Sequence, residues 1–225
     1  MVAHAVSRVG ADEFVPHTSS LRTLDTAARA CRGCELYERA TQTVFGEGPP
    51  RAGLFLVGEQ PGDVEDVEGA PFVGPAGRLL DKAMAEAGLD RNEVYVTNAV
   101  KHFRWRAAAA GKRRIHDTPA ARHIAACQPW LEAELGVVRP RIVVALGAVA
   151  AVALLGAGFR LTQHRRELQT WPPPKGPYSD SELDIAGVLA TVHPSAVLRA
   201  RSDTRGELYS GLVRDLAQAG QMAAA

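Results

Sequence analysis

An apolar run that leads straight into a glycine-containing turn constrains this fold more than any other feature of the sequence. Residues 54–57 read Leu-Phe-Leu-Val, which is typical of a buried strand, and residues 58–63 read Gly-Glu-Gln-Pro-Gly-Asp. Glycine lets the backbone turn sharply and approach a ligand closely. In open α/β sheets, ligands bind beyond the carboxyl ends of the strands. We therefore expect a ligand site that includes Glu59, Gln60 and Asp63, although an ordinary polar turn could have the same sequence.

Strand-like and helix-like segments alternate along the rest of the chain. Further strands are expected at residues 94–97, 141–146 and 188–192, and helices at 21–39, 76–87, 119–135, 147–155 and 204–218. The stretches 101–117 and 160–183 are predicted to be irregular, and the first is basic. This alternation predicts a three-layer α/β/α sandwich with a central, mainly parallel four-stranded sheet. Glu59, Asn98 and His193 each follow a strand and are expected to meet at one edge of that sheet.

The length of 225 residues fits one domain, placed at residues 21–220 after a flexible N-terminal arm at residues 1–20. The net charge of +1 shows no global basicity, so any surface for nucleic acid must be a local patch. No apolar run approaches the roughly 18 residues of a membrane helix, and residues 1–17 lack the apolar core of a signal peptide. We expect a cytoplasmic monomer without a membrane partner.

The three cysteines limit the class of protein further. Cys31 and Cys34 form a Cys-x-x-Cys pair and Cys127 stands alone, an odd number that disfavours a disulfide framework. A reducing compartment and a metal site both fit this pattern. The pair by itself leaves structural and redox roles open.

An ordered set of motifs resembles the uracil-DNA glycosylase superfamily. The motifs are the turn at 58–62, Pro-Phe-Val-Gly-Pro-Ala-Gly at 71–77, Thr-Asn-Ala-Val-Lys at 97–101 and His-Pro-Ser at 193–195. The Cys-x-x-Cys pair and Val-Phe-Gly-Glu-Gly at 44–48 are similar to the iron–sulfur, thermophile-type branch. Each motif is weak alone, but together they cover residues 21–215 in order. The resemblance implies that superfamily's fold and an action on uracil-containing DNA.

The resemblance also assigns a uracil pocket. Phe72 matches the residue that stacks on the extruded base, and Gln60 and Asp63 are expected beside it. Asn98 would read the base, because an amide can donate to uracil O4 and accept from N3–H, whereas cytosine presents the opposite pattern. His193 would hydrogen-bond the charge that builds on the leaving uracil.

A basic loop carries a finer resemblance. Lys112-Arg113-Arg114-Ile115-His116, with the glutamine of the 58–62 turn, looks like the UdgX group, whose members end up covalently joined to uracil-containing DNA. Glu59 would stabilise the sugar cation, and His116 would attack C1′ after uracil leaves as free base. Glu59 and Gln60 are expected to orient the His116 ring. Single-stranded DNA is expected to be the preferred substrate. Its phosphates would be held by Lys112, Arg113, Arg114 and Ser195. Without the resemblance, the loop would be interpreted as a nonspecific backbone binder.

Members of the iron–sulfur branch use four cysteines as cluster ligands. Three of these positions match Cys31, Cys34 and Cys127, and the remaining one is His102. Because imidazole can ligate cluster iron, we predict a structural 4Fe–4S cluster on these four side chains. Alternatively, His102 is a surface residue and an external ligand completes the site.

Three functions stay open from the sequence. The first is single-turnover excision with covalent capture by His116. The second is an ordinary multiple-turnover uracil-DNA glycosylase in which His116 is incidental, and it would release uracil in molar excess over protein. The third is a non-catalytic iron–sulfur DNA-binding module, which would produce neither uracil nor adduct.

Overall fold

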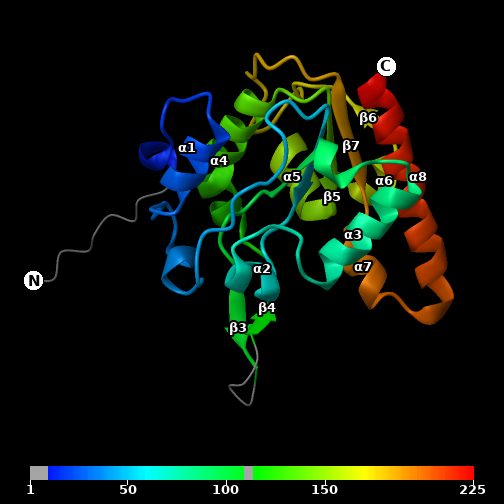
Figure 1. Ribbon diagram of the computed structural model, residues 1–225, viewed down its shortest axis with the longest axis horizontal. Helices are drawn as coiled ribbons and strands as arrows, with labels where there is room; N and C mark the ends of the chain where they lie inside the picture. Colours follow the sequence, from blue (N-terminus) through cyan, green and yellow to red (C-terminus); the bar gives the residue numbers. More distant parts are fainter. Residues whose placement is uncertain (1–9, 109–113) are drawn as a thin grey trace, which may run out of the picture.

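The computed structural model describes residues 10–108 and 114–225. A five-stranded sheet lies between two layers of helices (Figure 1). The strand order is β2 (Val94–Asn98), β1 (Leu54–Gly58), β5 (Ile142–Leu146), β7 (Gly187–Thr191) and β6 (Leu168–Gln169). The first four strands are parallel, and β6 is antiparallel to β7. The predicted α/β/α sandwich is confirmed, and β6 adds a short edge strand to the four that were expected.

Alternate residues of the strands point to opposite faces of the sheet and build two cores. On one face Phe55, Val57 and Val143 pack against α4 (Ala121–Val138) and α5 (Ala148–Leu155). The other face packs against three helices, α3 (Pro75–Glu86), α7 (Pro194–Arg199) and α8 (Ser202–Ala224). Within the described residues, no helix has both the length and the apolar character needed to cross a membrane.

The N-terminal segment differs from the predicted arm and helix. Residues 10–20 contain η1 (Asp12–Phe14), and Ala11 is completely buried in a small core with Leu24 and Trp130. The helix expected at 21–39 ends early as α1 (Leu21–Ala28), and a separate turn, η2 (Glu35–Glu38), follows the Cys-x-x-Cys pair. Beyond the end of α1, the carbonyl of the glycine between the two cysteines accepts a hydrogen bond from the Gly10 amide, which joins this turn to residues 10–14.

Several short elements were not expected from the sequence. A two-stranded antiparallel hairpin, β3 (Trp105–Ala107) and β4 (Arg114–His116), forms within the basic stretch. The others are α2 (Asp63–Glu68), η3 (Arg91–Glu93) and α6 (Leu161–His164). The hairpin projects from the carboxyl end of the sheet beside α2 (Figure 1).

A buried ion pair connects the end of β2 to α4. Lys101 Nζ lies 2.5 Å from Glu134 Oε2 and also donates to Thr97 Oγ1 and to the carbonyl of Asn98. The other carboxylate oxygen of Glu134 accepts from Thr97 Oγ1 and from Tyr95 Oη, each at 2.9 Å. Both charged side chains are at most 1% exposed. Because all of its polar atoms are used, this network holds the segment that follows Asn98.

We expect Glu134→Gln to lower the free energy of unfolding by about 3–5 kcal/mol, because it leaves the Lys101 ammonium buried without its counter-charge. The measurement is urea denaturation at pH 7. The double variant Lys101→Met/Glu134→Gln should recover part of the loss. Arg29→Ala, which breaks the exposed Asp25–Arg29 pair, is the control and should cost less than about 1 kcal/mol. Equal losses in Glu134→Gln and Arg29→Ala would contradict this interpretation of the pair.

Candidate active site

Three strands deliver their polar residues to the same edge of the sheet. Asn98 is the last residue of β2, Glu59 follows β1, and His193 comes two residues after β7. The parallel register places Gly58 directly beside Asn98. The backbone amides after Asn98 then bond to the turn after β1, with Ala99 donating to Gly58 and Val100 donating to Glu59. The expected meeting of these strand ends therefore has a direct structural basis.

Gly58, Phe72 and Asn98 pack closely together at this edge. A Cβ added to Gly58 would lie 2.3 Å from Asn98 Oδ1 and 2.7 Å from Phe72 Cζ, so only glycine allows these side chains to approach. Phe72 has a left-handed backbone, with φ of 58°, a conformation that costs a non-glycine residue about 1–3 kcal/mol. The Phe72 and His193 rings are stacked with centroids 6.2 Å apart. An aromatic ring and an amide thus lie side by side at the strand ends.

The hydrogen bonds of His193 define which of its nitrogens carries the proton. Nδ1 accepts from the Ser195 backbone amide at 3.1 Å and lies 2.8 Å from Ser195 Oγ. In the neutral ring the proton is therefore on Nε2, which can donate to a ligand. Burial, with smaller contributions from Arg199 and His116, lowers the pKa of His193 to about 4. The Ser195 hydroxyl, predicted to contact phosphate, is directed at His193 in this structure.

Glu59 and His116 face each other across the edge of the site. His116 Nε2 lies 3.5 Å from Glu59 Oε1, and that oxygen is buried without a hydrogen bond from any described residue. Burial raises the pKa of Glu59, against the opposing effects of Arg199 and a hydrogen bond from Thr118. Burial also lowers the pKa of His116, and Arg199 lowers it further. The neutral imidazole of His116 is therefore favoured at pH 7, and burial of Glu59 favours its protonated form, which Arg199 opposes.

Gln60 is hydrogen-bonded to both ends of the hairpin that carries His116. Its side-chain Nε2 donates to the carbonyls of Arg104 and Asp117, and its Oε1 accepts from the Arg104 amide, all within 3.1 Å. Both ends of the side-chain amide are thus used at the base of the hairpin. The structure shows no hydrogen bond between the described atoms of Gln60 and the His116 ring, so direct orientation of that ring by Gln60 stays a prediction. In this structure Gln60 positions His116 through the backbone.

Arg114 is also part of the framework. Its guanidinium pairs with Asp63 and with the buried carboxylate of Asp66, each at 2.5 Å, and it lies over the rings of Phe103 and Trp105. Arg114 was predicted to contact a phosphate and Asp63 to contact uracil. In this structure their side chains pair with each other and hold β4 against α2. The other expected phosphate ligands of the loop, Lys112 and Arg113, lie outside the described residues.

Arg199 is a site residue that the sequence analysis missed. It is the last residue of α7, whose N-cap is His193, and its charge acts on Glu59, His116 and His193 together. Its charge favours the carboxylate form of Glu59 and the neutral forms of the two imidazoles. A cation six residues after the histidine of the His-Pro-Ser motif, close to two turns of helix away, was the signal that could have identified it.

The predicted metal ligands do not assemble into one site. Cys34 and Cys127 are hydrogen-bonded to each other, but Cys31 accepts from the indole of Trp130 at 3.3 Å in a separate core cluster. His102 Nε2 lies 2.9 Å from Thr43 Oγ1. In the described part of the chain, no group of three or more histidine, cysteine or acidic side chains is arranged to hold a metal ion. In this arrangement the four side chains do not form the predicted cluster site, but a hydrogen bond to a cysteine sulfur does not prevent that sulfur from binding iron, so the cluster stays a prediction.

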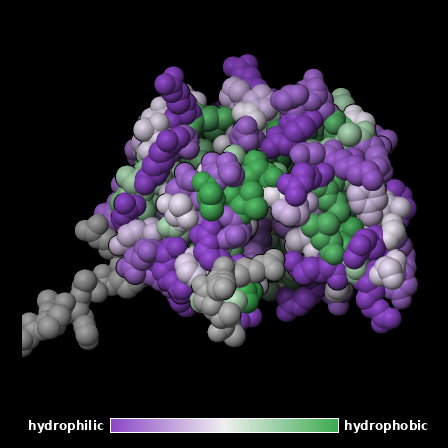
Figure 2. Space-filling view, turned by 60° about the horizontal axis from the view of Figure 1, so that its bottom comes forward, coloured by the Kyte–Doolittle hydropathy of each residue, from purple (hydrophilic) through white to green (hydrophobic). Residues whose placement is uncertain are grey.

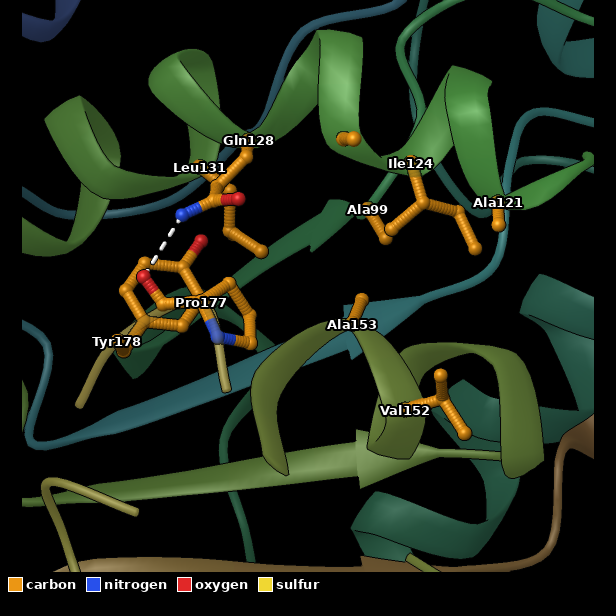
Figure 3. A pocket seen from close by; sticks show the side chains of 10 residues that line it. Ala99, Ala121, Ile124, Gln128, Leu131, Val152, Ala153, Pro177 and Tyr178 are labelled. Carbon is orange, nitrogen blue, oxygen red and sulfur yellow. Dashed lines mark hydrogen bonds between the residues drawn. The ribbon is translucent and has the colours of Figure 1, made fainter. Parts of the chain in front are cut away.

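A separate apolar cavity of about 140 Å³ lies between α4, α5 and the segment at Pro177 and Tyr178 (Figure 3). Gln128 crosses it to donate to the Pro177 carbonyl at 2.9 Å. Of its lining residues only Ala99 adjoins the site, through its neighbour Asn98. Among its lining residues Tyr178 is the one side chain that can ionise, and burial raises the pKa of its hydroxyl well above the usual range, so we assign the cavity no part in the reaction.

Arg114→Ala should loosen the hairpin, because it removes both ion pairs to α2 from a ribbon too short to be stable alone. We expect faster hydrogen exchange at the amide of Ile115, with unchanged exchange in β1 and β5. Arg106→Ala, which removes an exposed arginine from the same hairpin, is the matched control and should not alter exchange. Equal exchange in the Arg114→Ala and wild-type proteins would show that the ion pairs do not hold β4.

Comparisons with known proteins can now be set beside this geometry. The family model for the Uracil DNA glycosylase superfamily matches residues 45–217. A type-4 uracil-DNA glycosylase of Pyrobaculum aerophilum is 35% identical, covering 85% of this chain and 91% of the relative. One of Thermotoga maritima is 34% identical, covering 85% and 88%. The crystal structure of Pedobacter heparinus SMUG2 has a TM-score of 0.51 at 11% identity, covering 73% of this chain and 74% of that one, and supports the fold alone.

Proposed function

Because the chain belongs to the uracil-DNA glycosylase superfamily, we propose that it excises uracil from DNA. The observation that carries this proposal is the close packing of Gly58, Phe72 and Asn98 at the strand ends, with Glu59 next in the chain and His193 stacked on Phe72. An extruded base needs an aromatic face and a polar reader for its Watson–Crick edge. Phe72 and the Asn98 amide supply these two surfaces.

Two residues lower the barrier to breaking the N-glycosidic bond. The electron pair of the N1–C1′ bond leaves with uracil, and the negative charge spreads over its carbonyl oxygens. The Nε2–H of neutral His193 donates to that developing charge, which is an oxyanion-type stabilisation. The carboxylate of Glu59 stabilises the positive charge left at C1′. Water then attacks C1′ and gives up a proton, leaving an abasic site and free uracil.

A second candidate function is covalent capture of the DNA by His116. The specific observation in its favour is the position of a neutral imidazole 3.5 Å from the carboxylate that stabilises the sugar cation. A lone pair on a His116 ring nitrogen would form a bond to C1′, and the other ring nitrogen would then lose its proton to solvent. The resemblance to UdgX supports this outcome, whereas the names of the matched relatives support ordinary turnover.

His116→Gly and His116→Ser separate bond breakage from capture, because Glu59, Asn98 and His193 stay in place. If His116 is the nucleophile, the wild type should form an adduct that survives denaturing electrophoresis, and both variants should instead release several uracils per protein. His17→Ser, which removes an exposed histidine, is the control and should behave like the wild type. A wild type that itself turns over many times would show that capture does not occur and would leave the excision proposal intact.

The rate of uracil excision should fall in acid. Excision requires Glu59 to be ionised and His193 to be neutral. Burial raises the pKa of Glu59 above its ordinary value of 4.5 and lowers that of His193 to about 4. As the pH falls from 7, Glu59 therefore takes up its proton first, and the acid limb of the single-turnover rate should lie above pH 4.5.

Arg199→Gln should move that acid limb to higher pH, because loss of the cation raises the pKa of Glu59 and of His193. The measurement is the pH profile of single-turnover excision. Arg201→Gln removes a side chain that is 88% exposed two residues further on, and it should leave the limb where it is. An unmoved limb in Arg199→Gln would remove Arg199 from the site.

A further inference from the structure

A second concentration of positive charge lies outside the site described above. A pocket of about 570 Å³ opens between α8 and the segment that leads into β6. Three arginines line it, and Glu207 is the acidic residue among its lining side chains. The pocket is lined by Arg165, Arg166, Thr204, Glu207, Leu208, Gly211 and Arg214. It is polar and open, unlike the apolar cavity of Figure 3.

A buried carboxylate fixes two of these arginines. Asp215 is completely buried, and its Oδ2 accepts from Arg165 Nε at 2.8 Å and from Thr191 Oγ1 at 2.5 Å. Its Oδ1 lies 3.1 Å from Arg166 Nε, an ion pair without hydrogen-bond geometry. Both arginines are thus held through Nε, and Arg165 NH2 is buried without a hydrogen bond from any described residue. With exposed Arg214, three guanidinium groups oppose only two carboxylates, those of Asp215 and Glu207.

The backbone around this pocket is adapted to hold the arginines. Arg166 has a φ of 71°, a left-handed conformation that costs a non-glycine residue about 1–3 kcal/mol. Gly211 lets Arg165 reach α8, because an added Cβ would lie 2.5 Å from Arg165 NH2. Strain of this kind persists where surrounding contacts enforce it, and it concentrates at ligand sites. The pocket is therefore organised to present cations.

The pocket lies at the same edge of the sheet as the proposed active site. The amide of Arg166 donates to the carbonyl of Ala190, so Arg165 and Arg166 lie beside the carboxyl end of β7. That strand leads directly to His193, and neighbouring strands are about 4.8 Å apart. Figure 1 shows α8 along this side of the sheet, and Figure 2 shows the edge from below, largely covered by hydrophilic residues. A DNA strand crossing the edge at His193 would continue towards the pocket.

We propose that this pocket binds a backbone phosphate of the DNA strand that carries the uracil, at a nucleotide beyond the extruded one. The proposal rests on the proposed function, since that function brings a DNA strand to this edge. A phosphate diester carries one negative charge, which neutralises the excess charge of the pocket and gives the free nitrogens of Arg165 and Arg166 acceptors. Such a contact adds affinity without reading the sequence.

The test compares two double variants that each remove two positive charges. Arg166→Ala/Arg214→Ala empties the pocket and leaves Arg165 in place with Asp215. Arg51→Ala/Lys175→Ala removes exposed charges near the amino ends of the strands, away from the site. Binding to a uracil-free single-stranded oligonucleotide is measured against salt concentration. The pocket variant should lower the slope of log K against log salt by about 0.7 for each lost phosphate contact, and the control should keep the wild-type slope.

Circular dichroism and thermal unfolding of both variants establish that they are folded, and a conservative Arg166→Lys/Arg214→Lys variant should recover most of the slope. If pocket and control variants have the same slope, the pocket does not bind DNA and the proposal is overturned. A second arm titrates inorganic phosphate into each protein. If phosphate stabilises the wild type and not the pocket variant while the DNA slope is unchanged, the site serves free phosphate and the proposal is again overturned. Because the oligonucleotide has no uracil, failure of excision would not affect this result.

Discussion

The site depends on the close approach of β1 to β2 at their carboxyl ends. Gly58 and Asn98 are register partners, and the space a Cβ would fill at Gly58 is used by Asn98 Oδ1 and Phe72. A larger residue at Gly58 would clash with the Asn98 amide oxygen and the Phe72 ring. The buried Lys101–Glu134 pair then fixes the chain just after Asn98. The proposed recognition of the base therefore depends on backbone geometry as well as on side chains.

The hairpin of β3 and β4 also depends on the residues that follow β1. A ribbon with two three-residue strands has little stability of its own, so it takes order from its neighbours. Gln60 holds its base, and Asp63 and Asp66 hold Arg114. The turn after β1 thus provides Glu59 for chemistry and also positions the strand that carries His116. This double use explains why so many polar residues are concentrated in one short stretch.

Electrostatics then sets the protonation states of the reacting groups. Burial alone would favour neutral forms of Glu59, His116 and His193, since desolvation penalises every charge. Arg199 opposes this effect for the carboxylate and reinforces it for the two imidazoles. One cation at the end of α7 therefore favours the combination that the proposed bond cleavage needs. The same cation would attract the phosphates of a DNA strand, so substrate binding and the charge states of the site are linked.

The sequence by itself determined the alternation of strands and helices, and hence that Glu59, Asn98 and His193 lie at one edge, because parallel strands align their carboxyl ends. The resemblance also singled out Phe72 and His116 through motif order, and their roles stay predictions. Only the tertiary structure decided which side chains pack around Gly58 and which hold the framework. Gln60, Asp63 and Arg114 are polar residues of the kind that line binding sites. Each instead bonds to a residue distant in sequence, which only the folded chain brings near. Likewise, the separation of Cys31 and His102 from Cys34 and Cys127 follows from packing against Trp130 and Thr43, which no local pattern records.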